Sequence, residues 1–168
     1  MSQRIISVFL FIFLIVFQFY LAYQLYFLDR VYFFCPIEYR QDTIILRHDS
    51  YGSGDFLAER SGSRKHNGID LQAKIGTPIY ACRCGRVREA KFHKGMGNYV
   101  ELIHPGGYVT IYGHLSKMDV KENQFVRQGQ KIGEVGKTGN ANFRGIIPHL
   151  HLEVRQDGVP LDPMQFLE

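Results

Sequence analysis

The sequence predicts an all-β domain, built as a compact antiparallel β-sandwich or barrel and preceded by one N-terminal transmembrane helix. Three observations support this fold class. An apolar segment lies at the N-terminus, no later segment keeps a sustained apolar period of 3.6 residues, and short strand-like runs alternate with turns through the rest of the 168-residue chain. The 17 glycines add to the turn-rich character.

The N-terminal segment 5–28 contains only apolar and aromatic residues, except for Ser7, Gln18 and Gln24. A helix of this length measures about 36 Å, enough to cross a hydrocarbon core of about 30 Å. A cleaved signal peptide is the alternative, but its apolar region usually has only about 7–15 residues and ends at a small-x-small site. Large residues flank Ala22, so no such site is evident, and we expect an uncleaved membrane anchor.

These features divide the chain into three parts. Residues 1–28 are expected to form a cytoplasmic stub and the anchor, residues 29–46 a juxtamembrane linker, and residues 47–168 one domain that can bury its own core. The net charge of +4 is mild, and because no basic run or basic-aromatic patch occurs, we expect no nucleic-acid partner. The oligomeric state stays open.

The three cysteines do not define a disulfide framework. Cys82 and Cys84 are two residues apart, so on a strand they share a face and a disulfide between them would be strained. A zinc site of the C-x-C type would lack a second cysteine pair to complete it. We interpret both as small residues on a strand, and the disulfide state of these two and of Cys35 stays open.

Short strands account for most of the domain. The strand-like runs are 43–46, 77–81, 85–90, 98–104, 108–112, 130–135 and 150–155. The turn Pro105-Gly106-Gly107 joins the fourth and fifth runs into a hairpin. Residues 47–65 contain few apolar side chains and three glycines, and we expect an ordered loop there.

A pair of histidines carries the first candidate chemistry. His149 and His151 are two residues apart in a strand-like run, so their side chains lie on one face, about 7 Å apart, while Leu150 and Leu152 face the core. A histidine on such a face is usually a satisfied core residue. Two on a common face suit a metal site, in which one binds the ion and the other works beside it.

A second cluster strengthens the interpretation of this pair as part of a metal site. His66 and Asp70 flank Gly68, and a turn at the glycine would let an imidazole nitrogen and a carboxylate oxygen converge on one ion. With one histidine of the pair they make three ligands, and three protein ligands with an open fourth position is the form of a catalytic zinc site. The spacing leaves open which histidine of the pair binds. His114 follows a strand-like run and a glycine, where a loop can turn its ring into the same site.

In these residues the sequence resembles the lysostaphin-type (LytM-type) zinc metallopeptidases, which cut peptidoglycan peptides. The resemblance runs from about residue 47 to 163. The matching stretches are Arg47-x-Asp49, Phe56-x-Ala58-x-Arg60, His66-x-Gly68-x-Asp70-Leu71, Gly76-Thr77-Pro78, Gly97-Asn98-Tyr99-Val100, Tyr112-Gly113-His114-Leu115, Gly136-x-Thr138-Gly139 and His149-Leu150-His151-Leu152-Glu153.

The resemblance implies a role for each site residue. His66, Asp70 and His151 would hold Zn²⁺, and His114 and His149 would be the catalytic histidines. Residues 47–168 would then form an extracytoplasmic metallopeptidase domain of the family's antiparallel β-sandwich fold. Its substrate would be a peptidoglycan peptide, and residues 5–28 would hold it at the membrane.

Other residues have less definite roles. Asn98 and Tyr112 lie in motif positions where they would line a substrate groove, although Asn98 also suits a turn and Tyr112 a core. Glu153 shares a strand face with His151, so it either supports a metal ligand or faces solvent. The remaining histidines, which are His48, His93 and His104, have no partner pattern and are interpreted as surface residues.

Three other functions remain open. The family includes inactive members that lack some of the five site residues and activate other cell-wall hydrolases, so a non-catalytic activator of a cell-wall amidase is one alternative. A phosphotransfer module on a similar β-fold, with His149 or His151 as the acceptor, is another, although the membrane segment and Asp70 argue against it. The third is a zinc peptidase acting on proteins. The sequence does not indicate which peptidoglycan bond is cut, or whether residues 47–65 cover the site.

Overall fold

The computed structural model describes residues 3–26, 33–39, 43–60 and 62–167. Within these residues it contains one α-helix, α1 (Gln3–Tyr26), and thirteen β-strands. The other helical segments there are 3-10 turns, which are η1 (Pro105–Gly107), η2 (Gly139–Ala141) and η3 (Pro163–Gln165). The prediction of an antiparallel all-β domain preceded by one apolar helix is confirmed.

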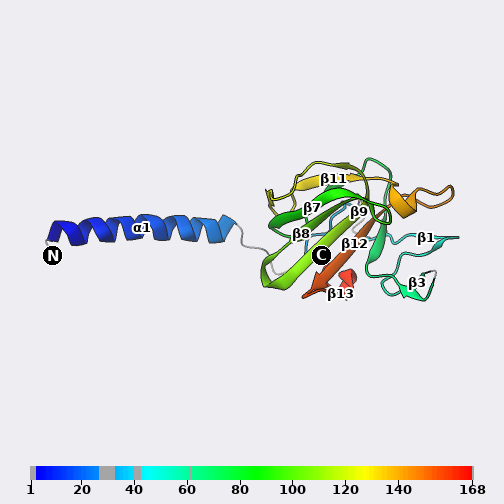
Figure 1. The fold of residues 1–168 in the computed structure, drawn as a ribbon, viewed down its shortest axis with the longest axis horizontal. Helices are drawn as coiled ribbons and strands as arrows, with labels where there is room; N and C mark the ends of the chain where they lie inside the picture. The colour runs from blue at the N-terminus through cyan, green and yellow to red at the C-terminus, as the bar shows by residue number, and fades with distance from the viewer. Residues whose placement is uncertain (1–2, 27–32, 40–42, 61, 168) are drawn as a thin grey trace.

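The N-terminal helix stands apart from the β domain, and no strand packs along it (Figure 1). Its segment Ile5–Tyr23 is long and apolar enough to cross a membrane, and none of that segment is buried. Between Ile5 and Tyr23 the helix carries no ionisable side chain other than tyrosine. A signal sequence meets the same criteria, so the uncleaved anchor over residues 1–28 stays a prediction.

One nine-stranded antiparallel sheet forms most of the domain. Six strands follow the order β10-β7-β8-β9-β11-β6, and β12 pairs with β9, β5 and β13. Their bounds are β5 (Ile69–Gln72), β6 (Pro78–Tyr80), β7 (Gly85–His93), β8 (Gly97–Ile103), β9 (Tyr108–Met118), β10 (Phe125–Val126), β11 (Lys131–Val135), β12 (His149–Gln156) and β13 (Val159–Leu161).

Two short hairpins lie at one end of the domain (Figure 1). They pair β1 (His48–Asp49) with β2 (Gly52–Ser53), and β3 (Glu59–Arg60) with β4 (Arg64–Lys65). The ordered loop predicted over residues 47–65 therefore contains two short hairpins. Strands of two residues with polar side chains carry no detectable apolar alternation, which explains why they escape sequence reasoning.

The strand β9 changes partners midway. Residues from Tyr108 to Gly113 pair with β12, and residues from Leu115 to Met118 pair with β11. The change falls at His114, whose backbone has a φ of 65°. The sheet curls there, which places β5, β12 and β11 around the same point. Sequence analysis ended this strand at residue 112 because the following glycine suggested a turn, but the chain continues through it as β9.

Most other strand predictions are confirmed with shifted ends. The runs at 77–81, 85–90, 98–104, 130–135 and 150–155 correspond to β6, β7, β8, β11 and β12. The strand predicted at 43–46 is wrong, because this segment forms only an isolated bridge between Leu46 and Leu71. The short strands β5, β10 and β13 were not predicted.

Part of the expected linker belongs to the domain. Phe33 and Ile37 are 3% and 2% exposed and lie in the main hydrophobic cluster. The ring of Phe33 packs edge-on against Tyr108 and Phe166, with centroids 5.6 and 5.4 Å apart. The described segments 33–39 and 43–46 thus pack on the sheet, whereas residues 29–32 and 40–42 of the expected linker lie outside the described residues.

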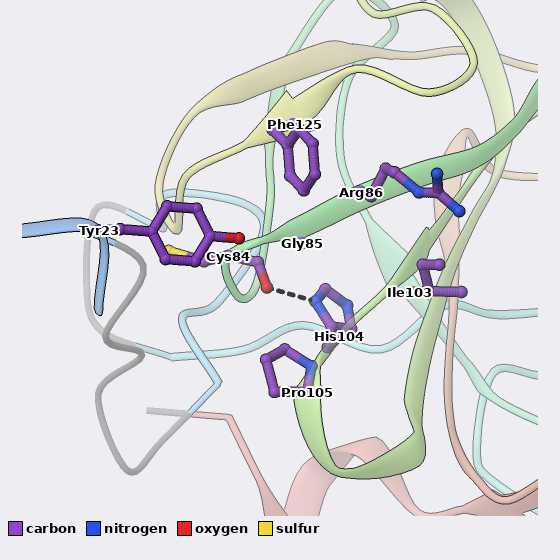
Figure 2. Close-up of a pocket in the computed structure, with 8 residues that line it drawn as sticks. All are labelled: Tyr23, Cys84, Gly85, Arg86, Ile103, His104, Pro105 and Phe125. Atoms are coloured by element: carbon purple, nitrogen blue, oxygen red, sulfur yellow. Dashed lines mark hydrogen bonds between the residues drawn. The ribbon is translucent and has the colours of Figure 1, made fainter. Parts of the chain in front are cut away.

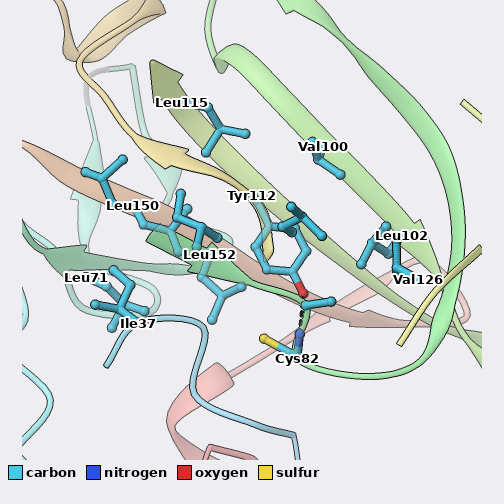
Figure 3. Close-up of a cluster of buried hydrophobic side chains, with 14 of the residues drawn as sticks. Ile37, Leu71, Cys82, Val100, Leu102, Tyr112, Leu115, Val126, Leu150 and Leu152 are labelled. Atoms are coloured by element: carbon cyan, nitrogen blue, oxygen red, sulfur yellow. Dashed lines mark hydrogen bonds between the residues drawn. The ribbon is translucent and has the colours of Figure 1, made fainter. Parts of the chain in front are cut away.

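The core lies on one face of the curled sheet (Figure 3). Leu71, Leu150 and Leu152 are fully buried, as the alternation of β5 and β12 requires. Tyr112 is also fully buried, and its hydroxyl accepts a hydrogen bond from the main-chain N–H of Cys82 at 2.8 Å. Of the two roles considered for Tyr112, the core role is favoured, because its ring is fully buried and its hydroxyl also accepts from Thr110, two residues earlier on the same strand face.

The cysteines Cys82 and Cys84 lie in the bend between β6 and β7, not on a strand. Both are buried, and neither forms a disulfide. Burial raises the pKa of the Cys82 thiol to about 12. Among the described residues, no group of possible metal ligands includes either thiol, so both act as core residues.

Candidate metal centre

Two antiparallel strands and the turn before them bring the candidate ligands together. In the register of β5 with β12, Asp70 lies opposite His151. Since Leu150 and Leu152 fill the core on the other face, both side chains point away from it. His66 precedes β5 and reaches the same point by way of Gly68.

Gly68 makes this approach possible. A Cβ atom there would lie 2.1 Å from the main-chain oxygen of Leu152 and 2.9 Å from Cγ of Glu153. Only glycine lets the segment before β5 lie this close to β12. The turn predicted at this glycine is present as a bend, and it brings the backbone close to β12.

Three ligand atoms form a compact triangle. His66 Nε2 lies 3.0 Å from His151 Nδ1 and 3.1 Å from Asp70 Oδ1, and the third edge, between His151 Nδ1 and Asp70 Oδ1, is 2.9 Å. Tetrahedral zinc with bonds of about 2.0–2.1 Å separates its ligand atoms by about 3.3 Å. Two imidazole nitrogens and one carboxylate oxygen at these separations fit one face of such a site, and the set is a candidate metal site.

Hydrogen bonds from the far side of each ring select the nitrogen that is offered. His66 Nδ1 lies 2.8 Å from the main-chain oxygen of Asp55, which can only accept, so this nitrogen carries the proton and Nε2 is free. His151 Nε2 lies 3.1 Å from Glu153 Oε1, which leaves Nδ1 free. Such outer contacts fix the tautomer and orientation of metal-binding histidines. Of the two roles considered for Glu153, the supporting one is favoured, since its side chain is 6% exposed.

Two arginines hold the second oxygen of Asp70. Arg47 donates from Nη2 at 3.0 Å and from Nε at 3.3 Å, and Arg60 donates from Nη2 at 3.2 Å, all to Asp70 Oδ2. Burial raises the pKa of Asp70, but the hydrogen bond and the positive charge of His151 outweigh it and hold the pKa well below its usual value. The carboxylate is therefore ionised and orients Oδ1 toward the two histidines.

Burial alone would lower the pKa of His151, but the carboxylates of Asp70 and Glu153 raise it to about 9. With no ion bound, both ring nitrogens of His151 are therefore protonated at neutral pH, and the charged ring lies between two carboxylates. A metal ion would take the place of the proton on Nδ1, since it binds the same nitrogen and also meets the carboxylate of Asp70.

Two further histidines adjoin the triangle. His149 Nε2 lies 3.9 Å from Asp70 Oδ1, and the rings of His114 and His149 are 5.0 Å apart between centroids. His149 Nδ1 lies 2.7 Å from the main-chain oxygen of Ile147, and His114 Nδ1 lies 2.9 Å from that of Thr138. Because a carbonyl only accepts, both Nδ1 atoms are protonated and both Nε2 atoms keep a free lone pair.

Both of these rings are neutral at pH 7. Burial, followed by the positive charge of His151, lowers the pKa of His114 to about 3. Burial likewise lowers the pKa of His149. The structure thus brings together all five residues predicted for the site, and all five are buried, between 3% and 8% exposed.

The other site predictions have mixed outcomes. Asn98 is half-buried and donates from Nδ2 to the main-chain oxygen of Leu115 at 3.1 Å, so it braces the strand beside His114, and its groove role stays a prediction. His48 and His93 are exposed, as predicted. The surface prediction for His104 is wrong, because it is 8% exposed and bonds to Cys84 and Thr110.

A pocket of about 300 Å³ lies at the other end of β7 and β8, where His104 is located (Figure 2). It is lined by Tyr23, Cys84, Gly85, Arg86, Ile103, His104, Pro105 and Phe125. It contains none of the five site residues, and both ring nitrogens of His104 have hydrogen-bond partners. The candidate chemistry therefore belongs to the His66–Asp70–His151 triangle and not to this pocket.

The comparison with known families decides the relationship. Residues 64–163 match Peptidase family M23. The chain belongs to this family. The match covers β5 through β13 and includes all five site residues, which confirms the resemblance to lysostaphin-type enzymes. Arg47 and Arg60, which contact Asp70, lie before the matched region. The sequence assigned them no role in the site and indicated them only through the motifs Arg47-x-Asp49 and Phe56-x-Ala58-x-Arg60.

Individual M23 relatives are similar over the same region. The peptidoglycan DD-endopeptidase ShyA of Vibrio cholerae is 43% identical over 100 residues, which are 60% of this chain and 22% of ShyA. The chain thus spans about a fifth of the length of that relative. A zinc-containing peptidase from Vibrio cholerae superimposes with a TM-score of 0.64 at 34% identity, over 82% of this chain and 40% of that one. The catalytic domain of lysostaphin from Staphylococcus simulans gives 0.58 at 35% identity, over 71% and 91%.

Proposed function

We propose that this M23 protein is a zinc-dependent endopeptidase that hydrolyses peptide cross-links of bacterial peptidoglycan. The observation that carries the proposal is the His66–Asp70–His151 triangle beside two neutral histidines with free Nε2 atoms. A structural zinc site is usually closed by four protein ligands, whereas three ligands leave a position for water or substrate. A non-catalytic activator would not need the two additional histidines.

The proposed division of labour follows from the tautomers. His66 Nε2, Asp70 Oδ1 and His151 Nδ1 would hold the ion, which would supply Lewis-acid activation of water and of the scissile carbonyl. The pair formed by His114 and His149 would move the protons. Each ring presents an unprotonated Nε2, so it can accept the proton of the attacking water and, once protonated, donate it to the leaving amine.

Burial favours this proton transfer. It keeps both rings unprotonated at pH 7, so their Nε2 atoms are available as acceptors, and a ring that has gained a proton is a strong donor because its pKa is depressed. A protonated ring can also donate a hydrogen bond to negative charge that develops on the carbonyl oxygen. Asn98, which braces β8 against the main chain near His114, would line the substrate-binding side.

The substrate class rests on the relatives. ShyA is named a peptidoglycan DD-endopeptidase, and it shares 43% identity with the matched region. The apolar segment Ile5–Tyr23 would hold the domain at the membrane. Since peptidoglycan lies outside the cytoplasmic membrane, we propose an extracytoplasmic, membrane-anchored domain, with residues 1–28 as stub and anchor and the domain beginning at Phe33.

The experiment compares the full chain in detergent with two variants, His151→Ala and His149→Ala. Zinc content is measured by atomic absorption, and release of muropeptides from purified sacculi by chromatography. We expect about one zinc per chain and muropeptide release for the wild type, zinc without activity for His149→Ala, and loss of both for His151→Ala. A wild type that binds zinc and leaves sacculi intact but cleaves an unrelated peptide would favour a protein peptidase. One that cleaves neither would favour an activator.

A further inference from the structure

The β1–β2 hairpin is tied to the loop before β12 by two hydrogen bonds. Asp49 Oδ2 accepts from the main-chain N–H of Ile147 at 3.0 Å, and the hydroxyl of Tyr51 donates to the main-chain oxygen of Arg144 at 2.9 Å. These contacts join positions 98 and 93 residues apart in the chain. The side chain of Asp49 is only 6% exposed, and its contact with Ile147 is partly buried.

The other oxygen of the same carboxylate faces the metal triangle. Asp49 Oδ1 accepts from Arg47 Nη1 at 2.7 Å and from the main-chain N–H of Tyr51 at 2.8 Å. Arg47 in turn donates to Asp70 Oδ2 at 3.0 Å. Asp49 therefore stands between the residue that orients a proposed metal ligand and the loop that leads into β12.

That loop controls the ring of His149. The main-chain oxygen of Ile147 accepts the Nδ1–H of His149 at 2.7 Å, which keeps Nε2 unprotonated and directed at the triangle. Pro148 has no N–H, so the nearest main-chain donor before His149 is the N–H of Ile147. Asp49 binds that donor.

We infer that Asp49 is a positioning residue for catalysis, which holds Ile147 so that the His149 ring keeps its tautomer and its direction toward the metal ligands. The contacts form one continuous path, from Asp70 through Arg47 and Asp49 to Ile147 and His149. The inference rests on the proposed function, because it assigns His149 to proton transfer.

An isosteric variant separates the contact of Asp49 with Arg47 from its contact with Ile147. In Asp49→Asn, one oxygen remains as an acceptor, and the cationic Arg47 is the stronger partner for it. The amide NH₂ must then face the N–H of Ile147, which places donor against donor. Asp49→Asn therefore releases the loop before His149 while leaving Arg47 on Asp70.

The test uses the zinc-loaded full chain in detergent micelles, with Glu59→Gln as the matched control. Glu59 is another carboxylate of the 47–65 segment, but its side chain is 89% exposed and pairs with Lys65. Three quantities are measured: kcat and KM on soluble cross-linked muropeptides, zinc affinity by chelator competition, and the ring tautomers by ¹⁵N-histidine NMR.

We expect Asp49→Asn to lower kcat by about 10–100-fold, the usual effect of removing an outer partner of a metal site. We expect its KM and zinc affinity to stay close to the wild-type values, because the contact of Arg47 with Asp70 is intact. The NMR signal of His149 should change to a mixture of tautomers, and those of His66 and His151 should not. Glu59→Gln should match the wild type throughout.

Two results would overturn the inference. One is an unchanged kcat together with an unchanged His149 signal. The other is a parallel loss of zinc affinity and activity with the His149 tautomer intact, which would show that Asp49 acts only through Arg47.

If the wild type cleaves no muropeptide, the proposed function fails, and the NMR and zinc measurements still decide whether Asp49 positions His149. Should Asp49→Asn not fold, Tyr51→Phe removes the second tie alone and should shift the same signal by a smaller amount.

Discussion

At the scale of single residues, the site is defined by which ring nitrogen each histidine offers. Main-chain oxygens of Asp55, Ile147 and Thr138 accept from Nδ1 of His66, His149 and His114, respectively. His151 is the exception, since Glu153 binds its Nε2 and leaves Nδ1 to the site. Four rings are thus oriented by hydrogen bonds that also fix their tautomers, and the three ligand atoms converge without rearrangement.

The raised pKa of His151 leads to a prediction about proton release. In the metal-free protein the pKa is about 9, so at pH 7 the ring is protonated, and zinc would have to displace that proton to bind. We expect about one proton to be released per zinc bound at pH 7, and the apparent affinity to rise by up to about tenfold per pH unit until pH 9, above which this dependence ends. Calorimetry in buffers of different ionisation enthalpy measures the release.

A variant of Glu153 provides the control for this measurement. Glu153→Gln removes one of the two carboxylates that raise the pKa of His151, so fewer protons should be released at pH 7 than in the wild type. A binding enthalpy that is the same in all buffers for the wild type would contradict the prediction. The exposed Glu122→Gln should behave as the wild type.

At the scale of elements, the site forms where strands exchange partners. The strand β9 leaves β12 and joins β11 at His114, and β5 pairs with β12 at Asp70 and His151. Glycines permit the close approaches at this point. At Gly136, a Cβ atom would lie 2.2 Å from the main-chain nitrogen of Ser116 and 2.6 Å from the main-chain oxygen of His114. The ligands therefore depend on how closely the strands approach one another.

Gly68→Ala tests this dependence. The added methyl group would meet the main-chain oxygen of Leu152 at 2.1 Å, so the segment before β5 must move away from β12. Overpacking of this kind costs about 1–3 kcal/mol, and it separates His66 from His151. We expect a lower thermal midpoint of the metal-free protein and weaker zinc binding, measured by calorimetry and chelator competition. Gly95→Ala, whose nearest contacts would be 3.4–3.5 Å, should change neither quantity appreciably.

At the scale of the whole molecule, the domain begins earlier than its motifs suggest. Phe33 packs on Tyr108 and Phe166, and its main-chain N–H donates to the oxygen of Phe166 at 3.1 Å. These contacts lie where β9 begins, whereas the metal triangle lies near Gly113, five residues further along the same strand. That spacing corresponds to about 17 Å along β9. The candidate site is therefore set away from the end of the domain to which α1 is joined.

Adjacent phenylalanines test whether this segment is structural. Phe33 is 3% exposed, whereas Phe34 is 40% exposed. Phe33→Ala should destabilise the full chain by about 3–5 kcal/mol, because truncating a buried Phe leaves a cavity in the core. Phe34→Ala should have a much smaller effect, since its ring is partly solvated already. Thermal unfolding followed by near-ultraviolet circular dichroism measures both, and equal midpoints for the two variants would contradict the assignment of 33–39 to the domain.

The sequence by itself determined the features that depend on local pattern. The apolar length of α1, the short alternating strands and the placement of His149 and His151 on one strand face all follow from residue type and spacing. The choice of ligands among the histidines did not follow from spacing and came from the family resemblance. Nothing local decided between the groove and core roles of Tyr112, or indicated that His104 would bond inside the core.

Only the tertiary structure decided the contacts between distant segments. The turn of β9 at His114, the arginines on Asp70 and the link from Asp49 to Ile147 join parts of the chain whose pairing depends on strand register. Several decisive partners are main-chain oxygens, such as those of Asp55 and Thr138. Every residue carries such an oxygen, so residue identity cannot show which of them will face a histidine; the folded register alone determines it.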